Sequence, residues 1–203
     1  MLFNSYPFLL IYLPTVICFF FVFTTFNLFR HAKLWLLISS LFFYGYWDIR
    51  YLPLLLGSIG FNYLVGNEII KYQCSRTRKN LLFFGIFTDL ALLFYYKYYN
   101  FFATNVLSEK YLVSELILPI GISFFTFTQV AFLIDTYQGK AEKSDIVSYG
   151  LFVTIFPHLI AGPILHHKEM LKQFNSNEMF RVNWRNIAQG IFLFTIVYLR
   201  KSL

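Results

Sequence analysis

The sequence predicts an all-α protein, a multi-pass transmembrane helical bundle with a re-entrant hairpin. Three observations support this. The 203 residues are 58% apolar and 22% aromatic. Only 13% are charged, whereas about 25% is usual in soluble domains. Apolar runs, several of them near the length of about 20 residues that crosses a bilayer, alternate with short polar segments. We expect a single membrane domain over residues 1–203, because no internal repeat or soluble module is visible.

The first apolar stretch, Phe8–Phe29, is long enough to span a bilayer. No basic segment precedes it and no small-residue cleavage site follows, so we expect a retained span rather than a signal peptide. Arg30 and Lys33 follow it. The next stretch, Leu34–Trp47, is shorter and ends in an aromatic cluster typical of a membrane interface.

The middle of the chain predicts three further spans. The span Tyr51–Ile70 is interrupted by Pro53 and by three glycines, which predict close contacts with neighbouring helices. These glycines are Gly57, Gly60 and Gly66. We expect Lys71–Asn80 to be a basic loop, followed by the span Leu81–Tyr96. A mostly polar connection, Lys97–Glu115, leads to the third of these spans. That span is Ile117–Ile134.

After the polar loop Asp135–Asp145, the apolar stretch Ile146–Leu165 is broken by Pro157, Gly162 and Pro163. Broken backbone at membrane depth is tolerated where it is buried in protein or lines a cavity. If this stretch crossed, the basic residues of His166–Asn186 would lie outside, against the positive-inside rule. We therefore favour a re-entrant hairpin over a crossing. The last apolar stretch is Ile187–Leu199.

Charge and cysteine content restrict the class of partner. The net charge is +7, and the basic residues cluster between apolar runs, where cytoplasmic anchors and contacts with anionic lipids are expected. This distribution of basic residues favours an N-terminus on the outer side of the membrane. It also favours the lipid bilayer, rather than nucleic acid, as the partner. Cys18 and Cys74 are expected to be unpaired thiols, and no metal-binding spacing is present.

Several polar side chains within or beside the spans are candidates for lining a chamber. Asp89 lies within Leu81–Tyr96, and an intramembrane carboxylate is a functional-site hypothesis, although a hydrogen-bonded structural role is an equal alternative. Lys97, eight residues later, would share its helix face. Gln129 is expected to bond across helices. Asp135 closes its span, at an interface where a charge costs little.

The chain has four histidines, and for each a structural or solvated role is favoured over catalysis. His158 is the one most suited to a cavity, because it follows Pro157 in the broken apolar stretch. A neutral imidazole there can line a chamber or bond a freed carbonyl. The others lie among basic residues near span ends: His31, His166 and His167.

Two long motifs carry a resemblance to a known family. They are LPIGISFFTFTQVAFLIDTYQGK at Leu118–Lys140 and FPHLIAGPILHHKEM at Phe156–Met170. Weaker matches are LFFYGYWDIRYLPLL at Leu41–Leu55 and YYKYYNFF at Tyr95–Phe102. Together they resemble the membrane-bound O-acyltransferase family, in the branch of the alginate O-acetylases. The resemblance covers nearly the whole chain and matches the N-terminal half of that family.

The resemblance implies transfer of an acetyl or acyl group from acetyl-CoA or another acyl thioester to hydroxyls of an exported or cell-envelope polysaccharide. It places the protein in a bacterial inner membrane, with acetylation partner proteins on the outer side. The catalytic histidine of the family lies in a Trp-His-Gly context that this chain does not contain. We therefore expect a truncated, N-terminal part of an acyltransferase-like fold that is inactive alone. A non-catalytic membrane scaffold and a transporter-like subunit stay as alternatives.

Overall fold

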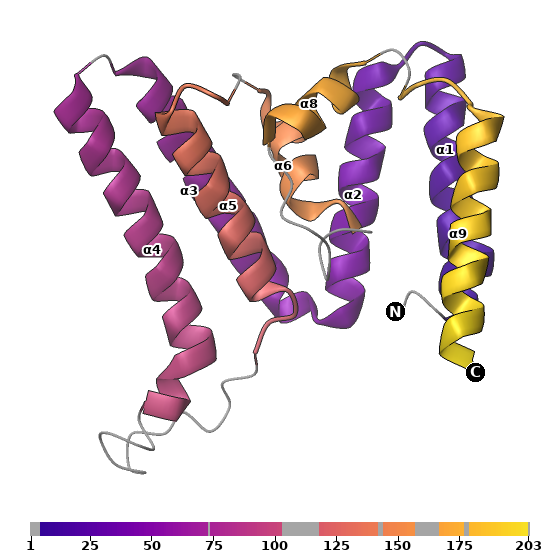
Figure 1. Cartoon of the computed structure of the whole chain (residues 1–203), viewed down its shortest axis with the longest axis horizontal. Helices are drawn as coiled ribbons and strands as arrows, with labels where there is room; N and C mark the ends of the chain where they lie inside the picture. The colour runs from indigo at the N-terminus through magenta and orange to yellow at the C-terminus, as the bar shows by residue number, and fades with distance from the viewer. Residues whose placement is uncertain are drawn as a thin grey trace. The chain divides into compact units, whose positions relative to one another are not determined.

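The computed structural model describes residues 5–72, 74–102, 118–141, 144–156, 167–176 and 179–202, and no strand occurs among them (Figure 1). The all-α prediction is confirmed. By length and composition, two helical segments in this part of the chain can cross a membrane, Phe8–Thr25 and Ser75–Phe102. The chain forms two compact units. The terminal unit comprises Met1–Leu36 and Asn175–Leu203, and the central unit comprises Leu37–Phe174.

In the terminal unit, a π-helical turn η1 (Phe8–Tyr12) continues into α1 (Leu13–Thr25). Helix α2 (Phe29–Trp47) follows, and its residues from Leu37 onward belong to the central unit. The predicted first span ended at Phe29, but the chain turns earlier. Asn27 has a left-handed backbone with φ 58°, a conformation that asparagine tolerates at helix ends. The indole Nε1 of Trp35 then donates to the carbonyl of Val16 at 3.1 Å, which ties the two helices together.

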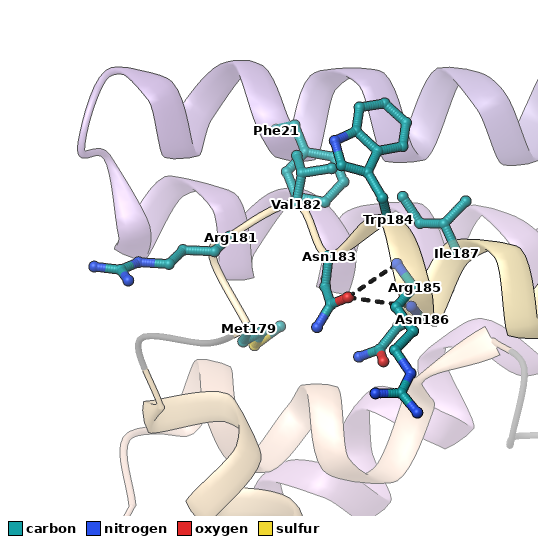
Figure 2. Close-up of a pocket in the computed structure, with 9 residues that line it drawn as sticks. All are labelled: Phe21, Met179, Arg181, Val182, Asn183, Trp184, Arg185, Asn186 and Ile187. Carbon is teal, nitrogen blue, oxygen red and sulfur yellow. Dashed lines mark hydrogen bonds between the residues drawn. The ribbon is translucent and has the colours of Figure 1, made fainter.

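The last helix of the terminal unit, α9 (Trp184–Ser202), begins three residues before the predicted apolar stretch. Asn183 explains the earlier start, because its Oδ1 accepts from the backbone N–H of Arg185 at 3.1 Å and of Asn186 at 3.2 Å (Figure 2). This is a helix N-cap. The ring of Phe180 packs against Phe20 and Phe29, so α9 starts beside α1 and the start of α2.

The central unit is built around three long helices that pack against one another in pairs (Figure 1). They are α3 (Leu52–Lys71), α4 (Ser75–Phe102) and α5 (Ile122–Tyr137). The short 3₁₀ turn η2 (Ile49–Tyr51) leads from α2 into α3, and α6 (Ile146–Thr154) contacts α3 and α5. The predicted polar connection His166–Asn186 also holds a helix, α8 (His167–Asn175).

Two boundaries in the central unit differ from the prediction. The predicted loop Lys71–Asn80 is mostly helical, because α3 continues through Lys71 and α4 begins at Ser75. Lysine and arginine are good helix formers, so a basic stretch does not stop a helix. The start of α5 shifts from the predicted Ile117 to Ile122, because Gly121 before it takes φ 70°.

The glycines of α3 behave in two ways. A Cβ at Gly66 would lie 2.5 Å from the ring of Phe132 on α5, so the predicted close contact is confirmed there. Gly57 and Gly60 have open space where a Cβ would stand, so the prediction is wrong for these two. On α4, a Cβ at Gly85 would lie 2.6 Å from Leu133. Close packing therefore centres on the side of α3 and α4 that faces α5.

The described part of the predicted hairpin, residues 146–156, contains helix α6, which ends at Thr154. Its nine residues reach about 14 Å, well short of the roughly 30 Å of a hydrocarbon core. The backbone N–H of Phe156 donates to Ser40 Oγ of α2 at 3.2 Å. Residues 157–166, with the predicted break, lie outside the described residues, so the re-entrant hairpin stays a prediction.

Candidate functional site: a buried polar cluster between three helices

Four polar side chains meet between α3, α4 and α5 and are all buried. We call them the polar cluster: Ser58 and Asn62 on α3, Asp89 on α4 and Gln129 on α5. Asn62 and Gln129 are fully buried, and Asp89 is 4% exposed. Lipid and apolar side chains offer no hydrogen-bond partners, so polar side chains inside an apolar helical bundle must bond to one another or to the backbone.

Hydrogen bonds connect all members of the cluster. Ser58 Oγ donates to Gln129 Oε1 at 2.7 Å. The amide Nδ2 of Asn62 donates to Asp89 Oδ1 at 2.8 Å and to the carbonyl of Ser58 at 3.2 Å. The same Nδ2 also contacts Gln129 Oε1. Asn62 is thus the common donor that ties α3 to both neighbouring helices.

Helical spacing and glycine packing explain the convergence. Ser58 and Asn62 are four residues apart, so they lie on one face of α3. Gly85 precedes Asp89 by one turn of α4, and its missing side chain lets Leu133 of α5 approach. Gly66 lies one turn beyond Asn62 on α3, and its missing side chain lets Phe132 of α5 approach. Close backbones bring short polar side chains within bonding range.

The cluster retains unused hydrogen-bonding capacity. Among the described residues, no partner meets Asn62 Oδ1, Asp89 Oδ2 or Gln129 Nε2. The Asn62 amide carries two protons, yet three oxygens lie within its reach. Native structures leave few buried polar atoms unpaired, so each unpaired atom needs a physical explanation. The cluster can therefore accept a further donor at Asp89 and offer one at Gln129.

A recess of about 290 Å³ between α3 and α4 reaches this cluster. Asp89 and Ser58 lie at its polar side. Its other lining residues are Pro53, Leu54, Gly57, Phe61, Thr88 and Leu92. Pro53 and Gly57 are exposed, so the recess opens onto the surface of the central unit.

Two further residues predicted to line the chamber, Lys97 and Asp135, are not hydrogen-bonded to the polar cluster in the described structure. Lys97 is not bonded to Asp89: its Nζ donates to Ser123 Oγ at 3.2 Å and lies over the Tyr98 ring. Asp135 is 8% exposed, so its side chain is buried rather than at an open interface. Its backbone carbonyl accepts from Lys140 and Ala141 after the end of α5. The structure thus joins Asp89 and Gln129 through Asn62, and bonds neither Lys97 nor Asp135 to them.

Of the four histidines, only His31 has a side chain in the part of the chain that the structure describes, and it does not join the polar cluster. His31 stands near the start of α2, stacked on Phe23 with ring centroids 6.5 Å apart, as expected for an end of a span. His158 and His166 lie outside the described residues. Among the described residues, no three side chains of histidine, cysteine, aspartate or glutamate gather where they could hold a metal ion. Both thiols, Cys18 and Cys74, are unpaired and exposed, as predicted.

A second recess, of about 690 Å³, lies at the start of α9 in the terminal unit. Its basic side chains are Arg181 and Arg185, which point away from each other, while the Trp184 ring lies near Phe21 (Figure 2). Asn183, at its centre, is used as the N-cap of α9. Because the guanidinium groups diverge, the side chains do not form one anion-binding site.

The sequence did not reveal the roles of Ser58 and Asn62. A signal was present, because a serine and an asparagine spaced by one helical turn interrupt an apolar segment. The glycines of that segment instead led to the prediction of close helix contacts. Asp89 and Gln129 were identifiable because each interrupts a longer apolar run.

Comparison with known proteins finds similar chains among bacterial O-acetylases. The chain is 38% identical to a peptidoglycan O-acetyltransferase of Helicobacter pylori, over 99% of this chain and 44% of that protein. It is 35% identical to a probable alginate O-acetylase of Pseudomonas aeruginosa, over 86% of this chain and 35% of the relative. A probable alginate O-acetylase of Pseudomonas putida is 34% identical over 87% of this chain and 37% of its own length.

The chain therefore spans less than half the length of these three relatives. No family model matches the sequence. No solved structure matches it.

Proposed function

Because the chain is homologous over most of its length to O-acetylases of the membrane-bound O-acyltransferase family, we propose that it serves the transfer of acetyl groups to hydroxyls of a cell-envelope polysaccharide. The observation that carries this proposal is the similarity to a peptidoglycan O-acetyltransferase over 99% of the chain. Peptidoglycan and alginate appear in the names of the relatives and stand as the acceptor classes to test.

The chemistry needs a base for the acceptor hydroxyl and hydrogen-bond donors for the oxyanion that develops during acyl transfer. In this proposal an acyl thioester such as acetyl-CoA supplies the acetyl group, and the polar cluster lines the chamber. Gln129 Nε2 is a buried donor without a partner among the described residues, which suits it to a developing negative charge. The proposed lining also includes Asp89, Lys97, Asp135 and His158, the last of which lies outside the described residues.

We further propose a bacterial inner-membrane location with the N-terminus outside. Phe180 contacts Phe29 with ring centroids 4.6 Å apart, so α2 and α9 begin at the same end of the terminal unit. Basic residues gather at this end, which fits the cytoplasmic side. They are Arg30, Lys33, Arg181 and Arg185.

This contact also supports the re-entrant hairpin. If α2, α3, α4 and α5 each cross, the chain has returned after α5 to the side on which α2 began. The start of α9 lies at that same end of the terminal unit. The stretch Ile146–Leu165 then enters and leaves the membrane on one side, in line with the shortness of α6.

The proposal is tested with membrane vesicles from cells that make the chain in its natural envelope and from cells that lack it. Radiolabelled acetyl-CoA is added, and label in the purified envelope polysaccharide is counted. We expect label only when the chain is present; equal label in both would contradict the proposal. The isolated chain in vesicles is expected to be inactive. Transfer by it that is lost in His158→Ala would instead assign the base to His158.

A further inference from the structure

We draw no further inference here: the strongest candidate, the recess between α3 and α4 beside Asp89, belongs to the site already described, and the Asp89 oxygen that has no hydrogen-bond partner among the described residues is enclosed by protein rather than open to the recess.

Discussion

Asn62 of α3 and Asp89 of α4 are joined by a hydrogen bond of 2.8 Å between buried side chains that are 27 positions apart in the sequence. The same Asn62 amide reaches Gln129 of α5. One side chain thus links three helices, and among the described residues Asp89 Oδ2 and Gln129 Nε2 have no hydrogen-bond partner.

Replacing Asn62 with alanine is expected to destabilise the bundle by about 1–2 kcal/mol, because Asp89 and Gln129 then lose their shared donor in an apolar setting. Thermal unfolding of the purified chain in detergent measures the change. Thr128→Val is the control, since it removes a hydrogen bond within a single helix. An Asn62→Ala protein as stable as the Thr128→Val protein would show that the cluster does not hold the helices together.

Gly66→Ala and Gly60→Ala make the same change on α3 with opposite expected signs. At Gly66 the added Cβ would lie 2.5 Å from the Phe132 ring, and that ring is already packed on Tyr149 with centroids 4.5 Å apart. Overpacking of this kind costs about 1–3 kcal/mol. At Gly60 the space is open, so alanine should add about 0.5–1 kcal/mol by restricting the unfolded chain. Unfolding temperatures that fall equally in both variants would contradict the packing described.

Membrane sidedness can be read from single cysteines in a Cys18→Ser background. Cys74, exposed between α3 and α4, should react with a membrane-impermeant maleimide only after intact cells are permeabilised. In proteins that also lack Cys74, Trp184→Cys should behave in the same way, whereas Ile49→Cys should react at once. Trp184 is 77% exposed and Ile49 is 70% exposed, so access is not limited by packing. Immediate reaction of Trp184→Cys would show that Ile146–Leu165 crosses the membrane.

The Asp48–Arg50 pair at the α2–α3 turn gives a pH dependence with a defined sign. Hydrogen bonds from Arg50 to both oxygens of Asp48, at 3.0 and 2.8 Å, lower the pKa of that carboxyl below 3.8. A lowered pKa in the folded state favours folding above the ordinary value, and this contribution is lost as pH falls through the lowered pKa. Arg50→Gln should return the pKa of Asp48 towards 3.8, as followed by carboxyl ¹³C NMR. An unchanged titration would show that Arg50 is not its cause.

Composition and apolar runs were sufficient for the fold class, because membrane spans require long apolar segments. Boundaries were harder to predict. Asn27 ends the first helical segment before the charged residues are reached, and basic residues after Ser75 extend α4 instead of forming a loop. These outcomes depend on single backbone conformations and on helix propensity, which hydropathy does not measure.

Two of the four residues of the polar cluster could be predicted from the sequence. Asp89 and Gln129 stand out as polar residues in apolar runs, but their partners, Ser58 and Asn62, lie 27 to 71 positions away along the chain. Such pairings depend on how three helices pack, and that is set by glycines whose neighbours the sequence does not reveal. Lys97 shows the same limit, because it is two turns from Asp89 on α4 and yet bonds to Ser123 near the start of α5.

The proposed role in acetylating an envelope polysaccharide is tested most directly by the acetate that mild alkali releases from that polysaccharide after purification. We expect released acetate to fall to background when the gene for this chain is deleted from its own organism. It should return when the gene is restored, and fall again when the restored gene carries Gln129→Leu. Acetate that stays at the parental level in the deletion strain would contradict the account.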